Sequence, residues 1–306
     1  MDKVTVMLST YNGERFLHRQ INSILDQKNV EVNLLIRDDG SKDSTINILQ
    51  KYENEFANIE VIYGENIGYI KSFMKLVELV KVEENMFYAF SDQDDYWKPE
   101  KLYEGIKLMK EQKEIKIEPV AYYSDLNVVD ENEVFIKKAN SWEGSIDKYK
   151  LAMFIGIRGC TMIYNDRLQY LLHQFRYCPI SGHDTFVMLL AFWSGKVVYD
   201  SRAFINYRQT GNNLSLTGKN KLDNLKKNFT YVKKRLTTRA NIHQLNAYAV
   251  VSQFRDNIRD ANELKLIADY KKSFKTKIKL LRDKNFWNFK FSIKCFNLLF
   301  IIINKL

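Results

Sequence analysis

The 306-residue sequence predicts an α/β fold in which helices flank an open, mostly parallel sheet, with a helical, basic region at the C-terminal end. Two observations indicate this. Short runs rich in β-branched residues alternate with segments of helical periodicity over roughly the first 115 residues. From residue 219 onward only helical periodicity and basic residues are found. We therefore predict an α/β domain at residues 1–218 and a helical, basic region at 219–306.

The predicted sheet begins with four units of strand, polar loop and helix. The first three strands are expected at residues 4–8, 32–36 and 59–63, each followed by an apolar helix face. A fourth apolar run at residues 86–89 precedes the stretch FSDQDDYW. Pro99 is expected in the first turn of the next helix, where its missing N–H costs nothing.

The pattern becomes mixed beyond this point. Strands are expected at residues 120–124 and 134–137, and the segment CTMIYN is strand-like. A helix is expected at 182–194, followed by two further strand-like segments, KVVYD and AFINYR.

Composition and missing motifs exclude several classes of protein. The three cysteines are widely spaced without a C-x-x-C, which favours reduced thiols over a disulfide scaffold or a zinc site. The sequence lacks G-x-x-x-x-G-K-[ST], G-x-G-x-x-G after the first strand, H-E-x-x-H and G-x-S-x-G. A P-loop, a dinucleotide fold, a zinc protease and a serine hydrolase are therefore disfavoured.

Two acidic clusters are expected at one edge of the sheet, because RDDGS and FSDQDDYW each end a predicted strand. Like charges gathered there require a cation or ligand donors. Strand alternation would turn Asp92 and Asp94 to one side and Gln93 to the other. Carboxylates suit Mg²⁺ or Mn²⁺ shared with a substrate phosphate. The alternatives are a plain turn at DDGS and a helix cap at Asp94 or Asp95.

Six segments in this order resemble the inverting family 2 glycosyltransferases of the GT-A fold, and among them the bacterial rhamnosyltransferase-like branch. They are STYNGERFL, IRDDGSKDST, ENIGYIKSF, FSDQDDYWKPEKL, RGCTMIYN and SGHDTFVMLLAFWSGKVVYD followed by YRQTGNN. The resemblance implies transfer of a sugar from a nucleotide diphosphate donor to a hydroxyl of a cell-surface polysaccharide precursor. The sugar would be L-rhamnose from dTDP-rhamnose or a hexose from a UDP-sugar. The alternative is a catalytically inactive nucleotide-sugar-binding module that recruits partners through its basic tail.

The resemblance also implies residue roles. Asp94 and Asp92 would hold Mn²⁺ or Mg²⁺. Asp184 in GHD would be the catalytic base that deprotonates the acceptor hydroxyl, with a helix N-cap as its plainer role. The nucleotide sugar would be bound by Thr10, Tyr11, Glu14, Asp38, Asp39, Asn66, Gly68, Asp92 and Arg208. The acceptor side would hold Gly159, Cys160 and His183.

One position departs from the family pattern. Thr210 follows Tyr207, Arg208 and Gln209, where the family often carries a histidine able to approach the metal or the diphosphate. This substitution leaves open whether a third protein ligand holds the metal. Arg208 would still contact the diphosphate as a charged donor.

Charge is distributed unevenly, with net values of −8 for residues 1–130, +3 for 131–218 and +15 for 219–306. Residues 271–306 contain ten Lys and Arg and one acidic residue. They are interleaved with Phe286, Trp287, Phe289, Phe291, Phe296 and Phe300. This combination is typical of helices at an anionic bilayer surface, whereas the apolar run LLFIII is too short to span.

The expected location is therefore cytoplasmic and peripheral, on the inner face of a bacterial plasma membrane, and no signal peptide is expected at the N-terminus. The expected acceptor is a glycan or a lipid-linked oligosaccharide. A nucleic-acid partner is not expected. A helical lid or a homodimer contact is the alternative role of the tail.

Overall fold

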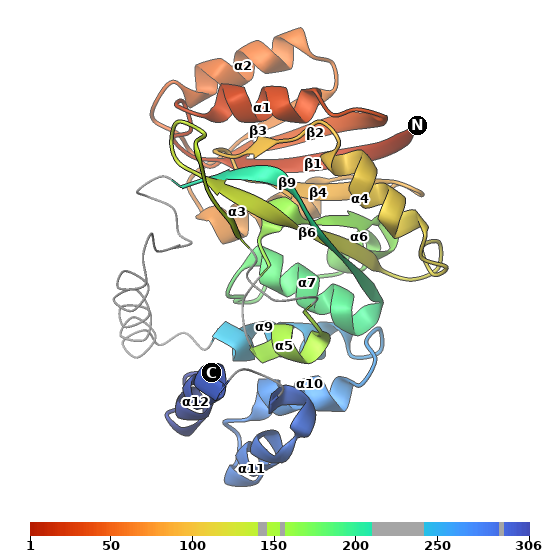
Figure 1. Ribbon diagram of the computed structural model, residues 1–306, viewed down its shortest axis with the longest axis vertical. Coiled ribbons are helices and arrows are strands. Elements are labelled where there is room, and N and C mark those ends of the chain that lie inside the picture. The colour runs from red at the N-terminus through yellow and green to blue at the C-terminus, as the bar shows by residue number, and fades with distance from the viewer. Residues whose placement is uncertain (140–145, 154–156, 210–241, 288–290) are drawn as a thin grey trace.

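A computed structural model describes residues 1–139, 146–153, 157–209, 242–287 and 291–306 of the chain (Figure 1). Its centre is a nine-stranded sheet with the order β3-β2-β1-β4-β8-β6-β9-β5, to which β7 adds by pairing with β6. The strands are β1 Asp2–Thr10, β2 Val30–Asp38, β3 Ile59–Tyr63, β4 Phe87–Ser91, β5 Tyr96–Trp97, β6 Val120–Val129, β7 Phe135–Ala139, β8 Ile163–Asn165 and β9 Lys196–Arg208.

The described helices lie on both faces of this sheet and continue beyond it. They are α1 Leu17–Leu25, α2 Thr45–Glu55, α3 Tyr69–Leu79, α4 Lys101–Lys110, α5 Lys148–Met153, α6 Asp166–His173, α7 His183–Ser194, α9 Ile242–Phe254, α10 Ala261–Asp269, α11 Phe274–Arg282 and α12 Phe291–Ile302, with short 3-10 helices η1 Gly159–Thr161 and η2 Lys284–Trp287.

The first half of the sheet is parallel, as predicted. Strand β1 pairs in parallel with β2 and β4, and β2 pairs in parallel with β3. The register joins Thr10 to Asp38 and Leu8 to Ser91, so the carboxyl ends of β1, β2 and β4 meet at one edge. The prediction that the polar strand ends converge is confirmed.

The second half is mixed. Strand β8 lies antiparallel between β4 and β6, and β6 is parallel to β9. The segments KVVYD and AFINYR are both in a strand, as predicted, and they belong to one continuous strand of 13 residues, β9. Its register against β6 shifts between Ser124 and Asp125, where β9 advances from Asp200 to Ala203. This irregularity absorbs two residues, so the strand continues across them.

The start of the fourth helix was predicted wrongly. Helix α4 begins at Lys101, two residues after Pro99. The intervening turn is closed by a hydrogen bond from the Lys101 N–H to the Lys98 carbonyl. The short strand β5, which pairs with β9, precedes this turn and was not foreseen.

The sheet separates two buried apolar clusters. One contains the inner faces of α1 and α4, such as Ile21 and Ile106, together with Val6 of β1. The other contains Met7 of β1 and the inner faces of α3, α6 and α7. The alternation of Val6 and Met7 between the clusters follows from the two-residue period of a strand.

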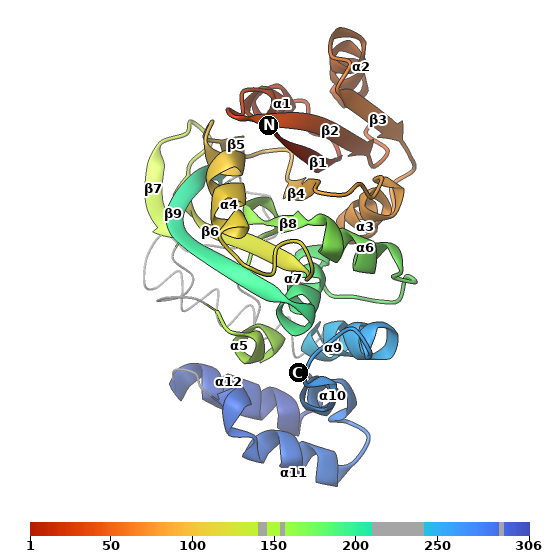
Figure 2. The same ribbon diagram turned by 90° about the vertical axis from the view of Figure 1, so that its right-hand side faces the viewer.

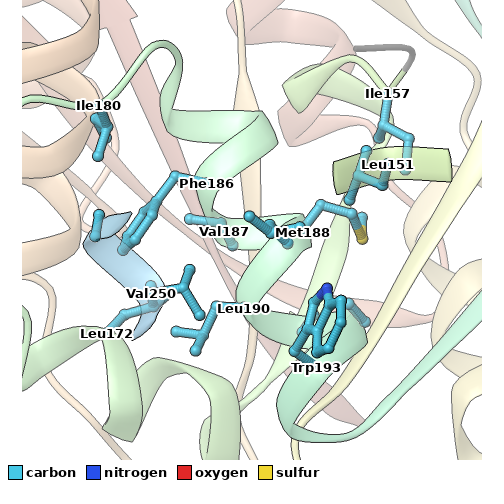
Figure 3. Close-up of a cluster of buried hydrophobic side chains, with 14 of the residues drawn as sticks. Leu151, Ile157, Leu172, Ile180, Phe186, Val187, Met188, Leu190, Trp193 and Val250 are labelled. Carbon is cyan, nitrogen blue, oxygen red and sulfur yellow. The ribbon is translucent and has the colours of Figure 1, made fainter. Parts of the chain in front are cut away.

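Helix α7 is almost entirely buried, and the exceptions are Asp184 at its start and Phe192 near its end. All but two of its twelve residues are buried, and Figure 3 shows Phe186, Leu190 and Trp193 within a cluster that includes Val250 of α9. Beyond α7, helices α9, α10 and α11 follow in successive layers away from the sheet (Figure 2). The described chain from residue 242 is helical, as expected, whereas the predicted boundary at residue 218 lies outside the described residues.

Candidate active site

The loop after β1 is fixed by a side chain from the loop after β4. The hydroxyl of Thr10 and the backbone N–H of Tyr11 both donate to Oε1 of Gln93, at 2.6 and 2.8 Å. A Cβ at Gly13 would lie 2.6 Å from the same Oε1, so only glycine fits there. Gln93 therefore points toward the first loop, and the side chain of Tyr11 is left 42% exposed beside it.

Both carboxylates of RDDGS are buried and hydrogen-bonded. Asp38 accepts from the N–H groups of Gly40 and Ser41 at 3.1 and 2.9 Å, which is the turn considered from the sequence. Asp39 accepts from the guanidinium of Arg37 and from the N–H groups of Ile67 and Gly68, both at 2.9 Å. Asp39 thus ties the loop after β2 to the loop after β3.

The remaining donor-side residues lie on the surface of this edge. Asn66 and Gly68 are exposed, and Gly68 has a φ of +83°, a conformation that favours glycine. Glu14 is exposed as well, and its Oε2 accepts from the N–H of Ser44 at 2.8 Å, just before α2. Glu14 therefore caps a helix from a distance, besides its expected place near the nucleotide.

The acidic motif forms a turn after β4 rather than a continuation of the strand, which ends at Ser91. Strand alternation was therefore the wrong reason for the orientation of Asp92 and Asp94, although Gln93 does face away. Asp92 and Asp94 are half-buried, whereas Asp95 is fully buried. Burial, the charge of Asp94 and the charge of Asp184, in that order, raise the pKa of Asp92 to about 7.

A deeper group lies below this turn. Ligand atoms of Asp92, Asp95 and Cys160 lie within 4.8 Å of one another, and within the described residues Oδ2 of Asp95 has no hydrogen-bond partner. Burial is the main cause that raises the pKa of Asp95 and of the Cys160 thiol. The structure therefore brings Asp95, considered from the sequence as a helix cap, and Cys160, expected on the acceptor side, next to Asp92.

The predicted base lies across from this turn, at the start of α7. Gly182 is the N-cap residue, and Asp184 is in the first turn, where its Oδ1 accepts from the N–H of Thr185 at 2.7 Å. A Cβ on Gly159 would lie 2.8 Å from Nε2 of His183 and 3.3 Å from Cβ of Asp184. Gly159, His183 and Asp184 are thus in direct contact, and glycine is required for that contact.

His183 is a neutral side chain held by aromatic rings. Its imidazole stacks on Phe73 with ring centroids 3.9 Å apart and meets the edge of Phe90 at 5.0 Å. Burial lowers the pKa of His183 to about 4, against the opposing charge of Asp184. Neither ring nitrogen has a hydrogen-bond partner among the residues that the structure describes.

The side chain of Arg208 is engaged within the protein, whereas the sequence suggested that it contacts the diphosphate. Its side chain is buried, and its Nε donates to the carbonyl of Asp94 at 3.1 Å. The two remaining nitrogens donate to the carbonyl of Glu131 and to the carboxylate of Glu133, at 2.7 and 2.9 Å. Arg208 therefore fixes the acidic turn to the loop between β6 and β7. Thr210 lies outside the described residues.

A comparison with protein families identifies the family of this chain. Residues 5–166, just over half of the chain, match the family model described as Glycosyl transferase family 2. The chain belongs to glycosyl transferase family 2. Asp184 and Arg208 lie beyond the part of this family 2 chain that the model matches.

Two curated relatives are bacterial proteins of this kind. The chain is 35% identical over 102 residues to the dTDP-rhamnosyl transferase RfbG of Shigella flexneri, covering 32% of this chain and 35% of that protein. It is 35% identical over 109 residues to the putative teichuronic acid biosynthesis glycosyltransferase TuaG of Bacillus subtilis, covering 35% of this chain and 42% of TuaG. The matches thus span well under half of each relative.

A solved structure shares the fold over the whole family 2 chain. The crystal structure of S. aureus TarS 1-349 in complex with UDP-GlcNAc has a TM-score of 0.56 and 17% sequence identity, covering 99% of this chain and 82% of that chain. The mixed sheet flanked by helices is accordingly the GT-A fold predicted from the sequence.

Two residues of the site were missed by sequence reasoning in this family 2 chain. Tyr69, at the start of α3, meets the edge of His183, and burial together with the charges of Asp184 and Asp92 raises its pKa. Arg158 precedes the glycine that contacts His183. Tyr69 belongs to the segment ENIGYIKSF and Arg158 to RGCTMIYN. Their positions directly beside ENIG and GC could have indicated a place in the site.

Proposed function

We propose that the protein is an inverting glycosyltransferase that moves a sugar from a nucleoside diphosphate donor to an acceptor hydroxyl. The observation that supports this best is the convergence of Asp92, Asp94 and Asp184. Ligand atoms of Asp92 and Cys160 lie within 4.8 Å of each other and the neighbouring Gly159 contacts Asp184, so the acidic turn and the start of α7 both border the η1 loop. Leaving-group binding and acceptor activation would thus be served by opposite sides of one site.

The proposed base is Asp184. A Cβ on Gly159 would lie only 3.3 Å from the Cβ of Asp184, so this loop packs closely against the proposed base and fixes its position. A carboxylate there would accept the hydroxyl proton as the oxygen attacks the anomeric carbon opposite the departing nucleotide. The neutral imidazole of His183 would orient the acceptor, because a neutral ring offers one N–H donor and one acceptor nitrogen.

A Mn²⁺ or Mg²⁺ ion fits the acidic turn. Asp92 and Asp94 present half-buried carboxylates whose mutual repulsion a cation would relieve, and the unpartnered Asp95 oxygen noted above lies beneath them. Hard cations prefer such oxygen ligands and keep positions for phosphate and water. When bound, the ion would stabilise the negative charge on the leaving diphosphate. Asp92 and Asp94 remain the proposed ligands.

The nucleoside would lie along the edge formed by β1 and β2. Exposed Tyr11 offers an aromatic face for the base or ribose, and Thr10, Glu14, Asn66 and Gly68 are the other proposed contacts from the loops at this edge. Asp38 and Asp39 fix the two loops and remain the proposed acceptors of the base imide N–H. Names of relatives favour dTDP-rhamnose or a UDP-sugar as the donor, since RfbG is a dTDP-rhamnosyl transferase and TarS was crystallised with UDP-GlcNAc. A cell-surface polysaccharide precursor is the proposed acceptor.

A donor screen tests the proposed function. We expect dTDP or UDP nucleotides to bind the full chain with Mn²⁺ present, raising its melting temperature by several degrees at saturating ligand. Chelation of the metal with EDTA should lower the affinity. Calorimetry with dTDP-rhamnose, UDP-glucose, UDP-GlcNAc and GDP-mannose would measure the preference. An absence of binding to any nucleotide sugar, with or without Mn²⁺, would contradict the proposal.

The same proposal places the C-terminal helices at an anionic membrane surface. Within the described residues no helix is long and apolar enough to cross a bilayer. Part of the tail prediction was wrong, because Phe286 and Phe300 are buried in the protein. Phe289 lies outside the described residues, and the side chains of Phe291 and Phe296 are not described.

The exposed apolar side chains of the tail lie elsewhere. Leu298, Leu299 and Ile302 are 41%, 41% and 60% exposed, on the side of α12 opposite the buried Phe300. The Nζ of Lys277 donates to the carbonyl of Ile302 at 3.5 Å. The pKa of Lys271 is lowered by burial and by the nearby charges of Lys305 and Lys277. We call six residues the α12 patch: Leu298, Leu299, Ile302, Lys271, Lys277 and Lys305. They combine apolar area with neighbouring cations, as an interfacial helix requires.

Serine substitutions in the α12 patch test membrane attachment. We expect a variant with Leu298→Ser, Leu299→Ser and Ile302→Ser to lose most of its binding to vesicles of phosphatidylglycerol and phosphatidylcholine in sedimentation assays. Point changes are preferable to deletion of residues 271–306, which also removes buried Phe286 and Phe300. Ile117→Ser, at an apolar side chain 76% exposed far from the patch in sequence, is the control. Retained vesicle binding together with a fall in molecular mass would indicate a homodimer contact instead.

A further inference from the structure

We propose that Arg158 contacts the diphosphate of the bound donor, as the charged group that replaces the histidine missing at Thr210. This inference rests on the proposed function. Arg158 belongs to the loop that leads into η1, directly before Gly159. That loop lies between the acidic turn and the start of α7, where the bond to the leaving diphosphate would break.

The guanidinium of Arg158 is held in place by the protein but has a hydrogen-bond donor that is not used within the described residues. It lies over the ring of Tyr207 in β9, with its carbon 5.2 Å from the ring centroid. Its Nε is buried, and in the described part of the chain that nitrogen has no hydrogen-bond partner. An arginine with a buried, unpaired N–H is costly unless a ligand completes it. Its contact with Tyr207 holds the guanidinium next to β9, and a bound phosphate would supply the missing hydrogen-bond partner.

The charge of Arg158 acts on the acidic turn. It lowers the pKa values of Asp92 and of Cys160, which burial raises. The guanidinium is therefore within electrostatic range of the carboxylates proposed to share a cation with the diphosphate. A phosphate bound beside that cation would lie within the same range.

Of the other cations near this edge, two arginines are paired within the protein, and the Nζ of a fully buried lysine has no hydrogen-bond partner among the described residues. Arg37 donates to Asp39, to Ser72 and to the carbonyl of Glu65. Arg208 fixes the acidic turn, as described above. Lys101 is fully buried, with its Nζ 3.5 Å from the centroid of the Trp97 ring, and burial lowers its pKa to about 7.

A diphosphate needs such a partner because it leaves with additional negative charge. Guanidinium binds phosphate oxygens through two parallel N–H donors, which gives strength and direction. The sequence has Thr210 instead of a histidine after Tyr207, Arg208 and Gln209, so the arginine from the η1 loop would supply that contact.

Calorimetry with UDP and UMP, and with dTDP and dTMP, separates a diphosphate contact from a general effect. With Mn²⁺ present, we expect R158A to lower the affinity for the diphosphates roughly 10- to 100-fold, the range for a hydrogen bond to a charged group. Affinity for the monophosphates should change less than about twofold. R158K keeps the charge but loses the fork, so an intermediate loss is expected.

Three controls make the result decisive. R255A removes an exposed arginine after α9 and should bind all four nucleotides as the wild type does. Mn²⁺ without nucleotide should bind R158A at least as tightly as the wild type, because the variant removes a cation. Melting temperatures identify a misfolded R158A, in which case R158K carries the test.

Two outcomes overturn the inference alone. One is a wild type that binds diphosphates while the Arg158 variants bind them equally well, and the other is an equal loss for monophosphates and diphosphates. A wild type that binds none of the four nucleotides overturns the proposed function and this inference together.

Discussion

Asp184→Asn is expected to abolish sugar transfer while leaving donor binding nearly unchanged. Asparagine has the same shape and its carbonyl oxygen can still accept from the N–H of Thr185, so α7 should start as before. It has no capacity to accept the acceptor proton at neutral pH. Loss of a general base costs roughly 10²- to 10⁴-fold in rate, so kcat should fall by about that factor.

The measurement is transfer of radiolabelled sugar to an acceptor glycan, with donor affinity by calorimetry on the same preparation. Asp256→Asn, at an exposed carboxylate after α9, is the matched control and should keep full activity. Undiminished turnover in the Asp184 variant would sink the assignment of the base. A wild type that binds the donor without transferring sugar to any acceptor would instead favour the alternative of an inactive binding module.

The second large effect is expected at the acidic turn. Asp92→Asn and Asp94→Asn should each weaken Mn²⁺-dependent nucleotide binding at least roughly tenfold, since each removes one of the few charged oxygens available to a hard cation. The loss should be confined to the metal-dependent part of the affinity. Calorimetry with UDP or dTDP, with Mn²⁺ and then with EDTA, measures both parts.

Stability and metal binding must be separated at this turn. Asp95 is fully buried, accepts from the N–H of Arg208 at 3.3 Å and has a pKa raised by burial, so Asp95→Asn, which keeps an acceptor oxygen but removes the buried charge, is expected to raise the melting temperature. The half-buried Asp94 should not behave in this way. Nucleotide binding by the wild type that is indifferent to Mn²⁺ would count against a metal role for either residue.

Much of the first half of the fold could be predicted because its signals are local. The β-branched runs of β1 and β2 are bounded by polar turns, and parallel pairing then brings Thr10 and Asp38 into register. That register is a topological consequence, so the meeting of two acidic loops required no side-chain geometry. Asp184 could be placed only through a resemblance of motifs, because α7 comes from a distant part of the sequence.

The details that failed depend on long-range contacts. Arg208 looked free because its partners, Asp94 and Glu131, lie far away in the sequence and meet it only through the pairing of β5 and β6 with β9. Phe286 and Phe300 carry the same pattern as a membrane-facing aromatic, and only tertiary packing shows that they are buried. Asp92 and Asp94 were predicted to continue a strand that in fact ends at Ser91, one residue before Asp92.

The burial of α7 has a consequence for the order in which the chain folds during synthesis. The inner side of α7 packs against the sheet, but its outer side packs against Val250 and other residues of α9 (Figure 3). Until α9 has been synthesised, that outer side is left partly uncovered and is prone to aggregation. Helix α9 therefore completes the core late in synthesis. The helix that carries Asp184 becomes fully packed only after α9 has left the ribosome.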